Sequence, residues 1–196
     1  MRRTVVLVMA AVVGTLVVGS GVALAATITC GTTNPCLGTN DPDTITGNNN
    51  YNEVYAGAGN DYVRAFSGSD AVFGDEGNDI IDGYAGQDVI RGGPDGDGSA
   101  LGARFNETNL EGGEDGDTVY GGGGSDWIDA AYADMPSEFP DTPPFDESFG
   151  GPGNDHIYAV DGNMDMIDCG GGLRDVVYFD KGLDTIQNCE VKHRYS

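Results

Sequence analysis

The sequence repeats with a period of nine residues over most of its length. In rows of nine from Gly38 it reads GTNDPDTIT, GNNNYNEVY, AGAGNDYVR, AFSGSDAVF, GDEGNDIID and GYAGQDVIR. The sixth position of these rows is Asp, apart from Asn52, and the eighth is always Ile or Val. A fixed period of this kind is typical of an array of equal structural units stacked on one another.

The same phase continues after two interruptions, at about 98–106 and about 130–148. The later rows include GGEDGDTVY, GGGGSDWID and GGPGNDHIY, and three degenerate rows end the array. Every eighth position is aliphatic: Ile45, Val54, Val63, Val72, Ile81, Ile90, Leu110, Val119, Ile128, Ile157, Ile167, Val177 and Ile186. We therefore expect one repeat region over 38–187, an N-terminal cap at 26–37 and a C-terminal cap and tail at 188–196.

Each row divides into a turn and a very short strand. Its last three residues place one aliphatic side chain between two variable ones, which is the alternation of a half-buried strand. Its first six are turn formers, because Gly accepts positive φ and Asn and Asp tolerate the left-handed region. A chain of this kind coils with two rows per turn, about 4.8 Å apart. We predict an all-β fold, a right-handed parallel β-roll or β-solenoid.

Stacked coils would bring the repeated Asp residues together. Asp43, Asp61, Asp79 and Asp97 fall in one column of turns, and Asn52, Asp70 and Asp88 in the other. Carboxylates about 5 Å apart repel one another unless a cation neutralises them. Carboxylate and turn carbonyl oxygens suit Ca²⁺, whereas Mg²⁺ demands a tighter octahedron and transition metals favour His or Cys.

The composition agrees with a cation as partner. The chain has 24 Asp against 8 Glu and a net charge of −23, which would repel the phosphates of nucleic acid. An alternative is that the acids only keep the surface soluble. That alternative explains neither their phase with Gly nor the preference for Asp.

The rows resemble the haemolysin-type calcium-binding nonapeptide, the RTX repeat, written GGxGxDxUx with U a large aliphatic residue. GGGGSDWID and GGPGNDHIY match it at every fixed position. The resemblance implies that several Ca²⁺ ions bind between turns two rows apart, through Asp side chains and glycine-region carbonyls. The carboxylates it implies are those of Asp61, Asp79, Asp88, Asp126, Asp155, Asp70, Asp117, Asp43 and Asp97. The carbonyl region it implies contains Gly57, Gly59, Gly77, Gly86, Gly122, Gly124, Gly151 and Gly153.

The end rows, 38–55 and 159–187, depart from this pattern, and we expect them to cap the roll rather than to bind metal strongly. The degenerate rows carry Asp165, Asp175 and Asp184 at the sixth position.

The first 25 residues have the pattern of a secretory signal peptide. Arg2 and Arg3 precede an apolar run over 5–18, and small residues end the segment at Ala25. An uncleaved membrane anchor is the alternative. Cleavage would leave a secreted, extracellular chain without a membrane span.

Four Cys lie outside this segment: Cys30, Cys36, Cys169 and Cys189. An even number in an exported protein favours disulfides, and four Cys allow three pairings. Proximity in sequence favours Cys30–Cys36 and Cys169–Cys189, one near each end of the array. A zinc site is the alternative, although the sequence offers no Cys-x-x-Cys and only two His.

Neither a His-Glu-x-x-His motif nor a Gly-x-Ser-x-Gly motif occurs. We therefore predict a non-enzymatic, secreted calcium-binding protein with a structural or adhesive role, which folds when Ca²⁺ binds. Its other partner would be an extracellular or cell-surface macromolecule that contacts the two interruptions. The alternative is a small hydrolase or lyase with its site in the same interruptions.

Overall fold

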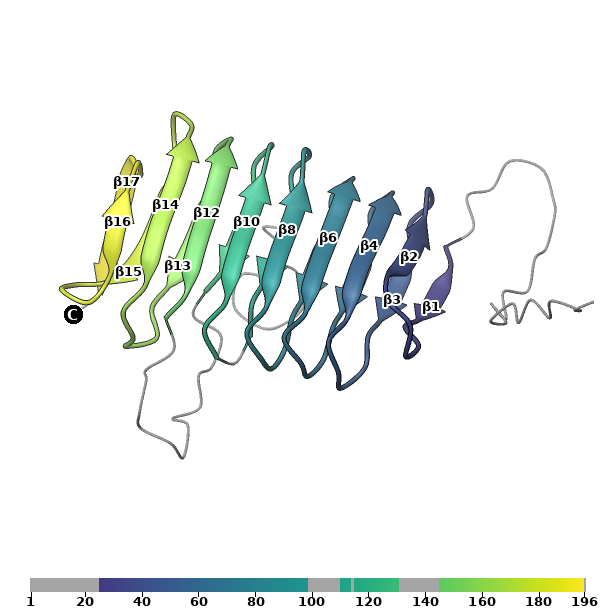
Figure 1. The fold of residues 1–196 in the computed structure, drawn as a ribbon. Helices are drawn as coiled ribbons and strands as arrows, with labels where there is room; N and C mark the ends of the chain where they lie inside the picture. The colour runs from purple at the N-terminus through teal and green to yellow at the C-terminus, as the bar shows by residue number, and fades with distance from the viewer. Residues whose placement is uncertain (1–24, 99–109, 114, 131–144, 196) are drawn as a thin grey trace, which may run out of the picture.

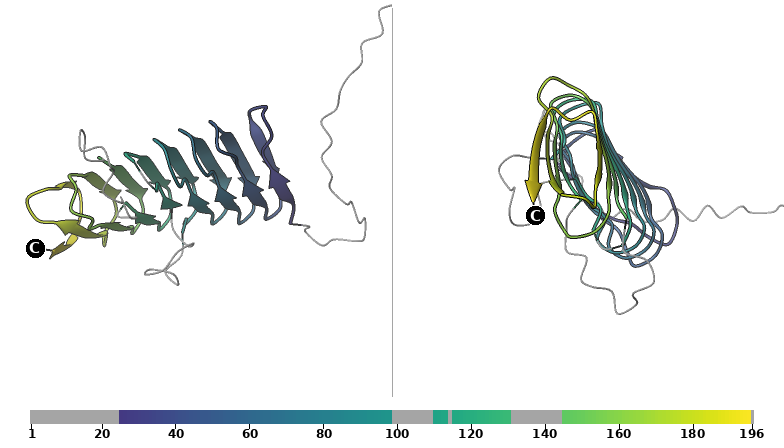
Figure 2. Two further views of the ribbon diagram at one scale, coloured as in Figure 1. Left: turned by 90° about the horizontal axis from the view of Figure 1, so that it is seen from below. Right: turned by 90° about the vertical axis from the view of Figure 1, so that its left-hand side faces the viewer.

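The computed structural model describes residues 25–98, 110–113, 115–130 and 145–195, which form a parallel β-solenoid of about eight coils (Figure 1). The all-β solenoid predicted from the nine-residue period is confirmed. Strands from the two halves of each coil build two sheets that face each other, as the end-on view shows (Figure 2, right). Within the described part of the chain, no helix has the length and apolar character needed to cross a membrane.

All strand pairs are parallel, and each strand pairs with the strand one full coil away. The nine-stranded sheet, sheet A, contains β1 (Thr27–Thr29), β3 (Thr44–Thr46), β5 (Tyr62–Arg64), β7 (Ile80–Asp82), β9 (Leu110–Glu111), β11 (Trp127–Asp129), β13 (His156–Ala159), β15 (Val176–Asp180) and β17 (Val191–Tyr195). The eight-stranded sheet, sheet B, contains β2 (Cys36–Thr39), β4 (Glu53–Ala58), β6 (Ala71–Glu76), β8 (Val89–Gly93), β10 (Thr118–Gly122), β12 (Glu147–Pro152), β14 (Met166–Gly171) and β16 (Thr185–Gln187).

The core is the aliphatic ladder that the sequence predicts. In sheet A, Ile45 is in register with Val63 and Val63 with Ile81. The corresponding ladder of sheet B faces it. Twelve of the thirteen predicted side chains are buried, and Ile186, at the end of sheet B, is partly buried against the others. Small residues at the first position of several rows, such as Ala56 and Ala159, fill the space between the ladders.

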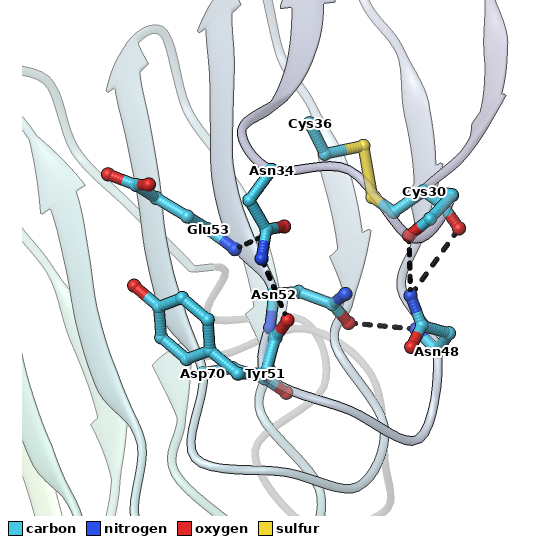
Figure 3. Close-up of a disulfide and its surroundings, with 9 residues drawn as sticks. Cys30, Asn34, Cys36, Asn48, Tyr51, Asn52, Glu53 and Asp70 are labelled. Atoms are coloured by element: carbon cyan, nitrogen blue, oxygen red, sulfur yellow. Dashed lines mark hydrogen bonds between the residues drawn. A yellow bond between two sulfur atoms is a disulfide. The ribbon is translucent and has the colours of Figure 1, made fainter.

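The segment expected to be an N-terminal cap forms the first coil, because β1 and β2 continue the two sheets. The predicted Cys30–Cys36 disulfide links these strands (Figure 3). Two side chains tie this linkage to the next coil. Asn34 donates a hydrogen bond to the Tyr51 carbonyl oxygen at 2.9 Å, and the Asn48 amide nitrogen lies 3.5 Å from the Cys30 carbonyl oxygen (Figure 3).

Both interruptions lie mostly outside the described residues, but their bounds differ from the prediction. Gly98 still donates its backbone N–H to the Asp79 carbonyl oxygen, so it belongs to the coil. The second interruption was predicted to end at 148. In the structure the chain returns to the coil before Asp146, and Ser148 lies in β12. The reason is that Ser148 occupies the buried eighth position, where an aliphatic residue was expected.

The second disulfide, Cys169–Cys189, joins β14 to the segment before β17, as predicted. β17 continues sheet A beyond β15, although its sequence lacks the repeat pattern. Sheet A therefore has one strand more than sheet B. Among the described residues, no strand of sheet B lies beyond β16 to face β17.

The buried ladder yields a prediction about stability. We expect Ile157→Ala to lower the free energy of unfolding by about 2–5 kcal/mol, because Ile157 is fully buried and its neighbours cannot close the cavity. Val191→Ala, at an exposed position of the same sheet, should change it by less than about 0.5 kcal/mol. Urea unfolding in saturating Ca²⁺ measures both, and equal effects would contradict the assignment of the core.

Candidate metal centres

The sixth residues of the rows stack into two columns, one at each turn edge of the roll. The first column precedes the strands of sheet A and consists of Asp43, Asp61, Asp79, Asp97, Asp126, Asp155 and Asp175. The second column precedes the strands of sheet B and consists of Asn52, Asp70, Asp88, Asp117, Asp146, Asp165 and Asp184. All are buried except Asp184, which is partly exposed.

One hydrogen bond repeats along both columns. The backbone N–H of each column residue donates to Oδ1 of the carboxylate one coil further on, at 2.6–3.3 Å. The Asp79 N–H, for example, donates to Asp97 Oδ1 at 2.8 Å. The repeated bond fixes the rotamer of each carboxylate and aligns its second oxygen along the column.

In most column residues that second oxygen has no hydrogen-bond partner. Oδ2 is buried and unpaired in Asp61, Asp70, Asp79, Asp88, Asp97, Asp126, Asp155, Asp165 and Asp175. In Asp43, by contrast, Oδ2 accepts from the N–H and the hydroxyl of Thr39. Leaving a buried charged acceptor unpaired costs more than the 1–3 kcal/mol of an unpaired neutral group. The same atom is unpaired at equivalent places coil after coil, so it is a property of the repeat.

The glycine at the first position of a row makes room for this oxygen. A Cβ atom at Gly121 would lie 2.5 Å from Asp126 Oδ2 and 2.6 Å from the Gly150 carbonyl oxygen of the next coil. At Gly150, a Cβ atom would meet Asp155 Oδ2 at 2.6 Å and the Cys169 carbonyl oxygen at 2.5 Å. Carboxylate and carbonyl oxygens thus converge in each cradle, and a set of oxygen donors suits a hard cation such as Ca²⁺.

Burial makes these carboxylates hard to ionise without a cation. Desolvation is the largest cause, and it exceeds the opposing effect of the backbone N–H bond in each case. It raises the pKa to about 6 for Asp70, Asp79 and Asp155, to about 7 for Asp61 and Asp126, and to about 8 for Asp88, Asp97 and Asp165. At neutral pH the columns therefore require either protons or cations.

The structure places all nine predicted Asp residues in the columns, six in the first and three in the second. The predicted glycines lie in the turns beside them, and Gly57, Gly59, Gly77, Gly86, Gly122, Gly124 and Gly151 adopt positive φ. Gly153 does not have positive φ, but it is constrained by the close approach of the Gly124 carbonyl oxygen.

Sequence reasoning missed Asp146, which the structure places in the second column. A signal was present, because Asp146 follows Asp117 by 29 residues, the same step that separates Asp88 from Asp117. One ligand atom of each of Asp146, Asp161 and Asp165 can be chosen so that all three lie within 4.8 Å of one another. Asp161 and Asp165 lie in a degenerate row, where we expected a cap, and Asp146 lies within the predicted second interruption.

The RTX calcium-binding nonapeptide repeat matches the chain in four copies, at residues 37–70, 64–98, 108–131 and 146–163. These matches cover more than half of the sequence. The chain belongs to the RTX repeat family. RTX nonapeptide repeats bind calcium, and the columns lie within the matched segments from Asp43 to Asp155. A comparison with curated proteins finds no match.

The raised pKa values predict how pH acts on this RTX roll without divalent cations. The folded pKa values of about 6 to 8 lie above the ordinary value of 3.8, so protonation favours the folded state. This contribution is fully present below about pH 4 and is lost as the pH rises through 6–8. Urea unfolding in a chelator should show stability falling from pH 5 to pH 8. Stability that is constant or rising over this range would contradict the assignment.

Proposed function

We propose that this chain is a secreted calcium-binding β-roll with a structural or adhesive role, whose fold depends on Ca²⁺. The observation that carries the proposal is the in-phase series of buried, unpaired Oδ2 atoms, each beside carbonyl oxygens of the next coil. A hard cation satisfies such an oxygen and removes the repulsion within the column.

The proposed ligands are the column carboxylates and the turn carbonyls between coils. They comprise Asp61, Asp79, Asp88, Asp126, Asp155, Asp70, Asp117, Asp43 and Asp97, together with the glycine-region carbonyls named above. Asn52 contributes no charge, and its amide nitrogen is buried without a partner. The first site of the second column should consequently be the weakest of that column.

The site between Asp146 and Asp165, near the end of the second column, differs from the others. Asp161 adds a third carboxylate beside Asp146 and Asp165. Its own oxygens accept hydrogen bonds from the backbone and side-chain amides of Asn163, which hold it in place. We include this group among the proposed calcium sites, although its row departs from the repeat.

Calcium binding should be coupled to folding for an electrostatic reason. The chain carries a net charge of −23, and most column carboxylates have no second partner in the fold. Ions that bind only the folded roll add their binding free energy to its stability. Calcium sites in extracellular modules typically bind at about 10⁻⁴–10⁻³ M, which matches a protein that loads after export.

Export is supported by the leader pattern and the two disulfides. Residues 1–24 lie outside the described part of the chain, so the leader remains a prediction. Disulfides persist in oxidising compartments such as the outside of the cell. The interruptions remain the proposed partner surfaces. The first interruption begins beside the first column, after Asp97. The second interruption ends beside the second column, before Asp146.

The enzyme alternative placed a hydrolase or lyase site in these interruptions. Residues 99–109 and 131–144 lie outside the described residues, so this alternative stays untested. No feature of the described coils favours it, and the family is typically structural rather than catalytic.

Circular dichroism tests the coupling directly. The chain without its leader should lose most of its strand signal in excess chelator and regain it on adding Ca²⁺. Equimolar Mg²⁺ should restore much less, because it dehydrates reluctantly and demands an octahedral site. A strand signal that ignores the chelator would refute calcium-dependent folding, and equal recovery in Mg²⁺ would refute calcium as the preferred ion.

A single substitution tests the columns. Asp126→Asn keeps an oxygen that can accept from the Asp97 N–H and replaces the unpaired oxygen by an amide nitrogen. We expect it to raise the Ca²⁺ concentration at the folding midpoint by at least about tenfold. Glu76→Gln, the equivalent change at the exposed end of β6, is the control.

In the same titration, Glu76→Gln should leave the midpoint within about twofold of the parent chain. An unchanged midpoint in Asp126→Asn would remove Asp126 from the proposed ligands. A loss of structure in saturating Ca²⁺ would instead indicate a packing role, which urea unfolding would show independently of Ca²⁺.

A further inference from the structure

The C-terminal end of this acidic roll carries a cluster of positive charge. Lys181, Lys192 and Arg194 line an open hollow of about 500 Å³, together with Tyr178, His193 and Tyr195. We call these six residues the C-terminal hollow. Three of the nine Lys and Arg residues of the chain meet there, and none of the described residues that line it carries a carboxylate.

The strand topology explains why these cations are exposed. Lys192 and Arg194 are two residues apart on β17, so they point to the same side, and they are in register with Val177 and Phe179 of β15. Val177 lies in the core, but no described strand of sheet B lies across from β17. Lys192 and Arg194 thus occupy inward positions of the ladder at an end that no described strand of sheet B covers.

Lys181 approaches from a different element. It follows β15, and its backbone N–H donates to the Tyr195 carbonyl oxygen at 3.1 Å, which holds this turn beside the end of β17. Tyr178, His193 and Tyr195 alternate with Lys192 and Arg194 in β15 and β17, so these aromatic side chains belong to the outer side of the sheet. Tyr178 stacks on His193 with ring centroids 4.6 Å apart, and Tyr195 is tilted against Tyr178.

The nearest acids are occupied elsewhere. Asp180 Oδ2 accepts hydrogen bonds from the backbone N–H groups of Asp161 and Gly162, at 3.0 and 2.8 Å. Glu190 Oε2 accepts from the Asp175 N–H at 3.0 Å. Both carboxylates are held by backbone N–H groups, and among the described residues the lining of the hollow contains no counter-charge.

We propose that the C-terminal hollow binds an oxyanion group, a sulfate or phosphate carried on a small molecule or on the end of a glycan. The Lys181, Lys192 and Arg194 side chains supply the charge-assisted donors that such a group requires. A long polyanion fits less well, because the acidic body of the roll would repel the parts outside the hollow. A single oxyanion group avoids this repulsion, because at physiological salt the charges of the acidic body are screened beyond about 8 Å.

Two other readings make different predictions. Charged residues on an edge strand can simply prevent pairing with another chain. Alternatively, the basic hollow can attract the acidic body of a second copy. Neither reading requires a bound oxyanion.

The test uses the calcium-loaded chain without its leader and isothermal titration with sodium sulfate. The charge-neutral pair Lys192→Gln/Arg194→Gln should weaken sulfate binding by at least about tenfold, a difference of about 1.4 kcal/mol. The pair Arg64→Gln/Arg91→Gln removes the same charge outside the hollow and should leave binding within about twofold. Circular dichroism in Ca²⁺ checks that all variants fold.

A sulfated tetrasaccharide and its unsulfated counterpart, titrated in parallel, distinguish a free ion from a glycan. Tighter binding of the sulfated sugar than of sulfate assigns the group to a glycan, and equal binding assigns it to a free ion. If both double variants lost sulfate binding equally, the effect would come from the net charge of the chain, and the proposal would be overturned. The proposal would also be overturned if the parent chain bound neither sulfate nor the sugars detectably. Sedimentation would then distinguish the two other readings, because attraction between copies gives a salt-sensitive dimer and protection of the edge strand does not.

Discussion

The fold depends on one repeated contact, the hydrogen bond from a backbone N–H to the Asp carboxylate of the next coil. It joins neighbouring turns along both columns and sets each carboxylate in a fixed rotamer. Only at the end of the first column does a Glu take this place, where Glu190 accepts from the Asp175 N–H at 3.0 Å. The excess of Asp and the excess of Gly in the composition therefore have one structural cause.

The same contact creates the main electrostatic problem of the molecule. With one carboxylate oxygen held by the backbone, the other is buried and unpaired in most column residues. Burial raises the pKa of these groups into or near the neutral range. A roll of this kind has two ways to fold, either with protons on the columns or with cations between them. The membership of the chain in a calcium-binding repeat family favours the second of these two ways.

The sequence predicts the periodic part of this structure well, because the period alone determines which side chains face inward. The aliphatic ladder, the two Asp columns and the two disulfides all follow from it or from proximity in sequence. The prediction failed where a residue broke the pattern without breaking the coil. Ser148 is small enough to lie buried between Val119 and Ile167, so the coil continues through a row that looks like an insertion.

The two ends were beyond the reach of the pattern for a different reason. A strand at the end of a solenoid packs against one neighbour only, so it needs no aliphatic residue, and β17 carries Lys192 where the ladder would place one. The ends also lack full repeats, and there a covalent bond supplements the ladder, through Cys30–Cys36 and Cys169–Cys189. A disulfide constrains the unfolded chain whether or not calcium is present. The roll thus combines a central array whose buried carboxylates need protons or cations with ends whose connections do not. Three of its nine Lys and Arg residues lie at the end where no described strand of sheet B faces β17.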